Sequence, residues 1–379
     1  MKVPLLDLTA QNGPLQAEIM AAIATVIENN SFIMGPEIAK IEKSVAAYSG
    51  AKHAIGVSSG TDAILIALMA LDIGQNDEVI TTPYSFFATA GCVTRMGAKP
   101  VLVDIDPVTY NINPALIEEK ATAKTKAIIP VHLYGQCADM DPILDIAAQR
   151  GLAVVEDAAQ AIGAEYRDGR RAGSIGKIGC LSFYPSKNLG AAGDAGMVLC
   201  QDDAAAEKIR VLRVHGGKPK YHHRMIGGNF RLDSIQAAVL NVKFGHLDEW
   251  TKKRQENADR YTALFESAGL PKKTGIRLPQ AVYRNSGVKH YHIYNQYVLR
   301  VPDRDRLREH MAKKEIGTEI YYPVPFHLQE CFRYLGHREG DFPEAERAAR
   351  ETIALPIYPE LDPGRQEYVT KEIIRFYGN

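Results

Sequence analysis

Short apolar runs alternate with amphipathic stretches over roughly the first half of the chain. Apolar residues at helical spacing predict helices at residues 16–29, 37–50, 61–74, 85–97 and 140–151. The intervening runs are β-branched and almost wholly apolar, which is typical of parallel strands covered by helices on both faces. They predict seven strands, at residues 53–57, 78–82, 100–105, 126–133, 152–157, 179–184 and 196–200.

This alternation predicts an α/β fold built on a mostly parallel seven-stranded sheet with helices on both faces. From about residue 203 the pattern changes to long helical stretches, mainly at 233–269, followed by shorter mixed segments. A smaller α+β domain is typical of such a pattern. We therefore expect a large α/β domain at residues 1–240 and a small C-terminal α+β domain at residues 241–379.

Composition narrows the class of protein. Lysine plus arginine equals aspartate plus glutamate, at 45 each. Such a balance gives no reason to expect nucleic acid or a membrane surface as partner. The five cysteines have no CxxC spacing, so neither a disulfide framework nor a zinc site is expected. With no apolar leader at the start of the chain, we expect a cytoplasmic protein.

Candidate chemistry gathers where the predicted strands end, because ligands of open parallel sheets bind at that edge. The segment "GVSSGTDA" (56–63) passes from a strand into a helix. Gly60 allows close approach to a ligand, and Thr61 opens the helix, whose N–H groups suit a phosphate. Taken alone, Ser59, Gly60 and Thr61 are more typical of an ordinary turn and helix cap.

Two further strand ends carry an acid and an amine. Asp157 closes "LAVVED" and Lys187 follows "LSFYPS". Asp157 alone fits a helix cap, and Lys187 alone fits a solvated loop charge. Together they match pyridoxal phosphate, whose ring nitrogen needs a carboxylate and whose aldehyde needs a lysine. The other needs of this cofactor, phosphate donors and a flat apolar face, are met by Gly60, Thr61, Ser182 and Phe86.

Two other enzyme classes have to be compared with this pattern. Ser58 stands in a G-x-S-x-G pattern, with Asp157 and either His215 or His327 following in the order of a serine hydrolase triad. However, a hydrolase elbow normally follows several strands, and only helical patterns precede residue 53. A nicotinamide enzyme is not favoured, because the chain contains no G-x-G-x-x-G.

Longer motifs carry a resemblance across nearly the whole chain. They include "FIMGPE" (32–37), "TTPYSFFATA" (81–90), "VEDAAQAIGA" (155–164), "SFYPSKNLGAAGDAG" (182–196) and "GGNFRLDSIQAAVL" (227–240). With these motifs the sequence resembles the nucleotide-sugar aminotransferases of the DegT/DnrJ/EryC1/StrS family. The resemblance implies the pyridoxal-phosphate-dependent transferase fold of type I, the aspartate aminotransferase architecture.

The resemblance also implies roles for single residues. Lys187 would hold the cofactor as a Schiff base and Asp157 would pair with its ring nitrogen. Phe86 would stack on the ring and Gln160 would lie beside it. The phosphate would be bound by Gly60, Thr61 and Ser182, and by Asn229 from the other subunit of a homodimer with composite active sites.

The implied reaction moves an amino group from L-glutamate to a keto nucleotide sugar for amino-sugar and surface polysaccharide biosynthesis. The stretch 221–250 resembles enzymes that aminate a 3-keto sugar, dTDP- or UDP-linked, with 4-keto sugars as the alternative. His222, His223 and Arg224 are candidates to grip the nucleotide diphosphate, although a solvated basic loop has the same pattern. Tyr321, Tyr322 and His327 are candidates for the sugar pocket, or for packing of the small domain.

Overall fold

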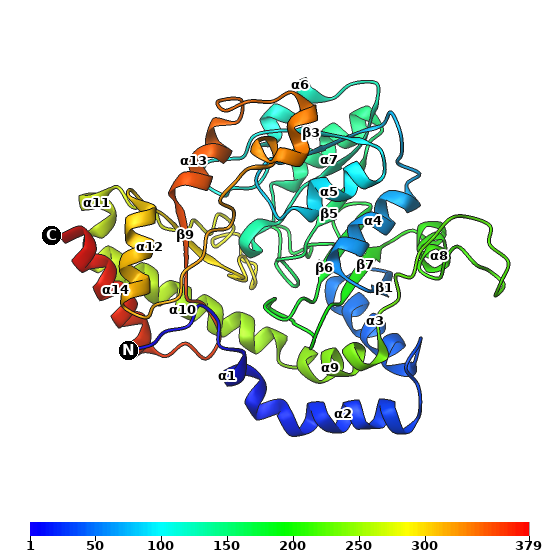
Figure 1. Cartoon of the computed structure of the whole chain (residues 1–379), viewed down its shortest axis with the longest axis horizontal. Coiled ribbons are helices and arrows are strands. Elements are labelled where there is room, and N and C mark those ends of the chain that lie inside the picture. Colours follow the sequence, from blue (N-terminus) through cyan, green and yellow to red (C-terminus); the bar gives the residue numbers. More distant parts are fainter. Residues whose placement is uncertain (379) are drawn as a thin grey trace.

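A seven-stranded sheet forms the centre of the computed structural model, which describes residues 1–378 (Figure 1). Its strand order is β1-β7-β6-β5-β4-β2-β3. All neighbouring pairs are parallel except those that β7 makes with β1 and β6. The strands are β1 (His53–Val57), β2 (Glu78–Thr81), β3 (Lys99–Leu102), β4 (Thr125–Ile129), β5 (Ala153–Asp157), β6 (Ile178–Ser182) and β7 (Gly196–Cys200). The predicted mostly parallel sheet of seven strands is thereby confirmed.

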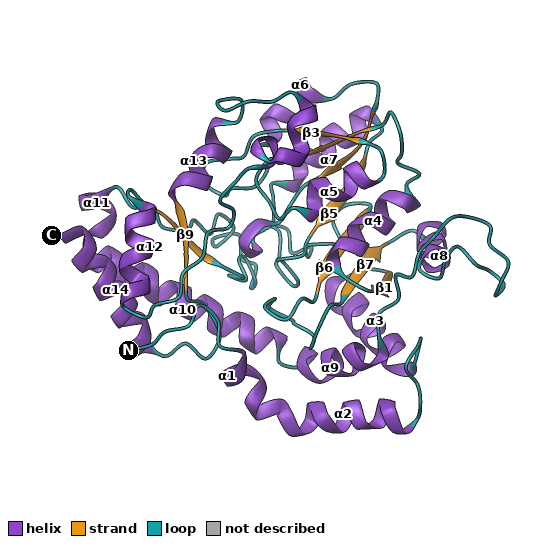
Figure 2. Cartoon of the chain, viewed as in Figure 1, coloured by secondary structure: helices purple, strands orange, loops and turns teal. Residues whose placement is uncertain are grey.

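Helices cover both faces of this sheet (Figure 2). Side chains alternate between the faces along each strand, so Val154 of β5 lies in one apolar cluster and Val155 in the other. The first face packs against α3 (Pro36–Ser49) and α7 (Met140–Arg150). The opposite face packs against α4 (Gly60–Ala70), α5 (Ala88–Arg95) and α8 (Asp203–Leu212). Each strand therefore delivers consecutive side chains to different environments.

Outside these two layers lie the remaining helices and a second sheet. The helical stretch predicted at 233–269 forms two helices, α9 (Ser234–Phe244) and α10 (Leu247–Ser267), with a break at Gly245. The second sheet pairs β8 (Tyr297–Arg300) antiparallel with β9 (Thr352–Leu355). The other helices are α1 (Leu8–Asn12), α2 (Gln16–Glu28), α6 (Ile117–Lys120), α11 (Leu270–Thr274), α12 (Arg304–Lys313), α13 (Pro343–Glu351) and α14 (Pro363–Gly378), and short 3-10 turns lie at Gly13–Leu15, Pro114–Leu116, Leu133–Gly135, Phe326–Leu328 and Glu330–Leu335.

The C-terminal part has an apolar core of its own. This core joins Tyr261 and Phe265 of α10 to β8, β9 and α14, and it also takes in Val3 near the N-terminus. Figure 1 shows the two chain ends on the same side of the molecule, next to this part. The division of the chain at residue 240 stays a prediction.

Candidate active site

A cavity of about 470 Å³ opens at the carboxyl ends of the strands of the large sheet. Its walls come from the loops that follow β1, β2, β5 and β6 and from the segment at Tyr321 and Tyr322. Ligands of open α/β sheets bind at this edge. The residues predicted from the sequence that line it are Gly60, Thr61, Phe86, Asp157, Gln160, Ser182, Lys187, Tyr321 and Tyr322.

The first turn of α4 forms one end of the cavity. Ser59 caps this helix, because its Oγ accepts a hydrogen bond from the Asp62 N–H at 3.0 Å. The N–H groups of Gly60 and Thr61 have no partner within the helix, and the helix dipole adds positive charge there. A Cβ at position 60 would lie 2.6 Å from the Ser182 Cβ, so only glycine allows this approach. The resulting set of N–H and hydroxyl donors suits a phosphate group.

Asp157 lies at the end of β5 with a side chain that is almost fully buried. Its Oδ2 accepts a hydrogen bond from the Thr89 hydroxyl at 2.7 Å, and its Oδ1 accepts one from the Ala159 N–H at 3.2 Å. Burial raises the pKa of Asp157, while these two donors and the nearby Lys187 oppose the rise. The carboxylate is thus held in place and faces a cavity in which a cationic partner would be favourable.

Lys187 follows β6 on a tight loop in which its N–H donates to the Tyr184 carbonyl at 2.9 Å. Close packing shapes the loop, because a Cβ at Gly190 would lie 2.3 Å from the Pro185 carbonyl oxygen. Desolvation lowers the pKa of the Lys187 amine to about 8, and the negative charge of Asp157 opposes this shift. A partly neutral amine near neutral pH can act as a nucleophile or a base.

Aromatic and amide side chains also line the cavity. The Phe86 ring is largely exposed and lies 6.2 Å, between centroids, from the Tyr322 ring. Gln160 links two backbone segments: its Oε1 accepts the Tyr134 N–H at 2.8 Å, and its Nε2 donates to the Tyr322 hydroxyl at 2.9 Å. Tyr322 therefore has a fixed position in the cavity, and its pKa is raised by burial, so it is a neutral hydroxyl at physiological pH.

Glu156, the neighbour of Asp157 on β5, faces the other side of the sheet and is fully buried. Its oxygens accept hydrogen bonds from three backbone N–H groups, those of Gly173, Ile175 and Gly176, at 2.6–2.8 Å. His132 completes the shell: its Nδ1 accepts the Ala138 N–H, so its Nε2 donates to Glu156 at 2.8 Å. The hydrogen bonds of this carboxylate are all made to groups inside the protein, so its role is to stabilise the fold.

Five of the predicted residues do not line this cavity. His222, His223, Arg224 and Asn229 are exposed on the loop between α8 and α9. His327 is buried, and its Nε2 bonds to Glu346 Oε1 at 3.0 Å. Three residues of the site are not among the candidates predicted from the sequence. Ser85 and Gln296 line the cavity, and Thr89 contacts Asp157. Ser85 and Thr89 lie in the motif at 81–90, which is a sequence signal for both.

The serine hydrolase alternative is wrong. The Ser58 hydroxyl donates to Asp62 Oδ2 at 2.6 Å, within the first turn of α4. Asp157 has Thr89 as its side-chain partner. Among residues 1–378 no histidine bonds to either of them, so the base that a serine nucleophile needs is missing from this geometry.

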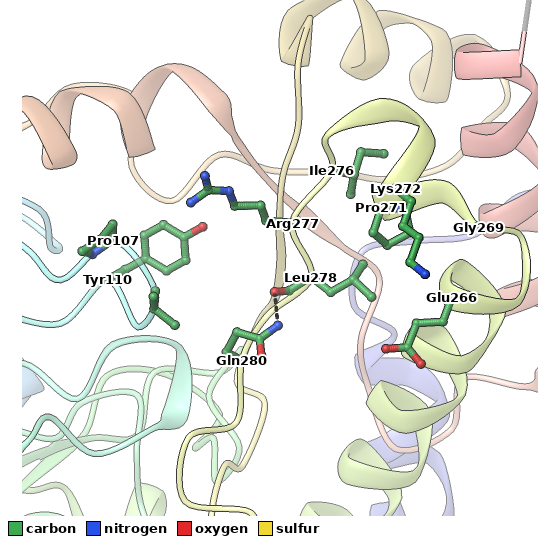
Figure 3. Close-up of a pocket in the computed structure, with 11 residues that line it drawn as sticks. Pro107, Tyr110, Glu266, Gly269, Pro271, Lys272, Ile276, Arg277, Leu278 and Gln280 are labelled. Carbon is green, nitrogen blue, oxygen red and sulfur yellow. Dashed lines mark hydrogen bonds between the residues drawn. The ribbon is translucent and has the colours of Figure 1, made fainter.

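A second cavity, of about 580 Å³, lies between the loop at Tyr110 and the segment that follows α10 (Figure 3). Its charged side chains are Glu266, Lys272 and Arg277. The start of the five-residue helix α11 borders it at Gly269 and Pro271, but its lining has no buried carboxylate and, among residues 1–378, no residue predicted from the sequence. We therefore place the candidate active site in the first cavity.

Known proteins match this chain along nearly its whole length. The model of the DegT/DnrJ/EryC1/StrS aminotransferase family matches residues 14–374. A "pleiotropic regulatory protein" of Geobacillus stearothermophilus is 52% identical, covering 100% of this chain and 99% of its own. A UDP-N-acetyl-3-dehydro-alpha-D-glucosamine 3-aminotransferase of Acidithiobacillus ferrooxidans is 42% identical, covering 97% and 95%. The crystal structure of S. venezuelae DesV with a ketimine intermediate superposes with a TM-score of 0.94, at 40% identity, covering 100% and 99%.

Fold and similarity together define a pyridoxal-phosphate-dependent aminotransferase of fold type I. The chain belongs to the DegT/DnrJ/EryC1/StrS aminotransferase family. The chemistry of the cavity fits the cofactor, since it offers phosphate donors at α4, a buried carboxylate at Asp157 and an amine at Lys187. The glycine at position 60 is part of this fit, because it leaves the space that a side chain would fill.

Proposed function

We propose that this aminotransferase transfers the amino group of L-glutamate to the keto carbon of a dTDP- or UDP-linked 3-keto sugar, for amino-sugar and surface polysaccharide biosynthesis. The observation that carries the proposal is the presence of Lys187, Asp157 and the N-terminus of α4 on one cavity. The name of the A. ferrooxidans relative, a 3-aminotransferase of a UDP-sugar, supports the substrate class and the ring position.

The proposal gives a physical task to several residues of the cavity. The N–H groups of Gly60 and Thr61 and the hydroxyl of Ser182 bind the phosphate, and Phe86 covers one face of the ring. Gln160 and Tyr322 supply hydrogen bonds at the ring edge. When bound, the cofactor supplies an aldehyde that condenses with amines and a protonated ring that withdraws electrons.

Asp157 keeps that ring nitrogen protonated. A carboxylate next to a pyridine nitrogen favours the charged form of both groups. Thr89 and the Ala159 N–H orient the carboxylate, and burial strengthens its interaction with a cation by excluding water.

Lys187 moves the proton. Its Nζ is neutral in an appreciable fraction of molecules near pH 8, so it can take a proton from the substrate carbon. The same nitrogen, now charged, can return the proton at a neighbouring carbon, acting first as general base and then as general acid. Both half-reactions, with glutamate and with the keto sugar, use this one group.

The proposal is tested with glutamate and a panel of 3-keto and 4-keto sugars linked to dTDP and UDP. We expect release of 2-oxoglutarate with glutamate alone, in an amount equal to the bound cofactor. A 3-keto sugar should then allow continuous turnover, with amination at carbon 3 seen by NMR of the product.

Two outcomes contradict this proposal in different ways. Turnover with 4-keto sugars alone would move the reaction to carbon 4. Cofactor binding without any 2-oxoglutarate would favour a regulatory protein, as the name of the Geobacillus relative suggests.

We further propose that the chain works as a homodimer with composite sites. Large apolar side chains are exposed on and after α2, at Met20, Ile27 and Ile33, each more than half exposed. Figure 1 shows α2 along one edge of the molecule, where a second copy could cover these side chains, as expected of an exposed apolar surface of this kind. In that arrangement the exposed Asn229 would reach the phosphate site of the partner.

Complementation between two inactive variants tests the composite site. A heterodimer purified through two tags, with Lys187→Ala in one chain and Asn229→Ala in the other, contains one site with both lesions and one intact site. We expect about half of the wild-type activity per dimer, because the two sites are equivalent by symmetry. If each site lay within one chain, the heterodimer would show only the residual activity of the Asn229→Ala site.

We also propose that the enzyme acts in the cytoplasm. All five cysteines are free thiols, and four of them are buried, as is typical of proteins in a reducing compartment. No helix within residues 1–378 combines the length and the apolar character needed to span a bilayer.

A further inference from the structure

We propose that Thr89, supported by Ser85, is a positioning residue that holds Asp157 ionised and oriented toward the cavity. The inference rests on the proposed function only in taking Asp157 as the partner of the cofactor ring nitrogen. It assigns a task to two hydroxyl groups that neither bind the phosphate nor move the substrate proton.

A chain of two hydrogen bonds leads from the cavity wall to the carboxylate. The Thr89 Oγ1 lies 2.7 Å from Asp157 Oδ2, and the Ser85 Oγ lies 3.0 Å from Thr89 Oγ1. Thr89 is fully buried and Ser85 nearly so. Ser85 also lines the cavity, so the chain joins the surface of the site to its buried charge.

The direction of these bonds follows from the charge of Asp157. An ionised carboxylate only accepts hydrogen bonds, so the single hydroxyl proton of Thr89 points to Asp157. The Thr89 oxygen then accepts, and Ser85 donates to it. Both hydroxyl dipoles therefore point their positive ends toward the carboxylate. Protonation of Asp157 would remove the reason for this order.

Local backbone structure places Thr89 where it can do this. It lies in the first turn of α5, and its N–H donates to the Phe86 carbonyl at 3.1 Å. The same short turn thus carries Phe86, which lines the cavity, and the hydroxyl that contacts Asp157. One local structure, "SFFAT" (85–89), sets both the apolar face and the charge of the site.

Burial and the Thr89 hydroxyl have opposite effects on the pKa of Asp157. Desolvation is the largest influence on Asp157 and raises its pKa, and the Thr89 hydrogen bond is the largest influence that lowers it. Without this bond the carboxylate would take up a proton at a higher pH. Other titratable groups around Asp157 come from every neighbouring element: Lys187, His132, Cys92, Cys180 and Tyr322.

The test removes the hydroxyl and keeps the shape. In Thr89→Val we expect pyridoxal phosphate to bind the apoenzyme about 10- to 100-fold more weakly, as for loss of a hydrogen bond to a charged group. The acid limb of the pH profile of cofactor affinity should also move to higher pH, because Asp157 is protonated sooner. Thr89→Ser, which keeps the hydroxyl, should restore both values to near wild type, and Ser85→Ala should show a smaller effect of the same sign.

Thr81→Val is the matched control. Thr81 is also a buried threonine whose hydroxyl is hydrogen bonded, to the Ile129 carbonyl at 2.9 Å, but it does not touch Asp157. It should lower the melting temperature without moving the acid limb. A Thr89→Val profile that matches that of Thr81→Val, with unchanged cofactor affinity, would overturn the inference.

Failure of the role that the proposed function gives to Asp157 has a different signature. In that case the wild-type protein would bind pyridoxal phosphate with no dependence on Asp157, so Asp157→Asn would bind it as well as wild type. If Asp157→Asn loses affinity while Thr89→Val does not, the proposed function survives and the positioning role of Thr89 is refuted.

Discussion

Replacing Lys187 by alanine should reduce both half-reactions by about three orders of magnitude or more, since general acid–base catalysis alone contributes up to about 10⁴-fold. The side chain supplies the amine of the cavity, and no other lysine among residues 1–378 lines it. Covalent attachment of the cofactor should also be lost. Single-turnover release of 2-oxoglutarate measures the first effect, and intact mass after borohydride reduction measures the second.

Lys243 offers a matched control within the same chain. It is a buried lysine, and burial lowers its pKa to about 8 as well, but it lies outside the cavity. Lys243→Ala should retain attachment at Lys187 and most of the activity per folded molecule. Equal losses of activity in Lys187→Ala and Lys243→Ala would contradict the prediction, because they would mean that the position of Lys187 in the cavity is not what matters.

The same prediction has a pH dependence with a definite sign. The Lys187 amine of the apoenzyme has a pKa of about 8, so its reactive neutral form grows as the pH rises through that value. Attachment of the cofactor should accelerate up to about pH 8 and then level off. In the apoenzyme, the penalty for burying the charged amine should be relieved between about pH 8 and the ordinary lysine value near 10.4.

Asp157→Asn should be the second most damaging substitution, with a loss of about 10²- to 10⁴-fold in turnover and weaker cofactor binding. Asparagine keeps the shape of the side chain but removes the charge that holds the ring nitrogen protonated. The apoenzyme should not be destabilised. Burial raises the pKa of Asp157 in the fold, so the ionised group costs stability at neutral pH, and a neutral amide removes that cost.

Glu156→Gln is the control that distinguishes a carboxylate needed for catalysis from one needed for stability. Glu156 is the adjacent residue on β5, yet it bonds to three backbone N–H groups and His132 on the far side of the sheet. Its loss should lower the melting temperature and leave activity per folded molecule near wild type. Thermal melts and kinetics of the two variants should therefore show opposite patterns; a stable but inactive Glu156→Gln would contradict this division.

Local pattern was enough to predict the sheet. The apolar runs at 53–57 and 196–200 coincide with β1 and β7, because a strand covered on both faces must be apolar along its whole length. Because ligands of open parallel sheets bind where the strands end, Gly60, Asp157 and Lys187 were predicted to belong to one site, and all three line one cavity. Helix starts were less predictable: the helix expected from residue 85 begins at Ala88, after the turn that contains Phe86.

Tertiary structure alone decided how side chains pair. Thr89 meets Asp157 across 68 positions of sequence, and Gln160 meets Tyr322 across 162. His327 pairs with Glu346, 19 positions along the chain.

The amino-acid sequence alone determined the types of element, the class of sheet and the residue types at its binding edge. These features follow from the spacing of apolar and polar residues that are close together along the chain. The tertiary structure alone determined the hydrogen-bond partners, the burial of each side chain and the resulting directions of the pKa shifts. These depend on how strands and helices pack, which brings together residues that are too far apart along the chain to form a local pattern.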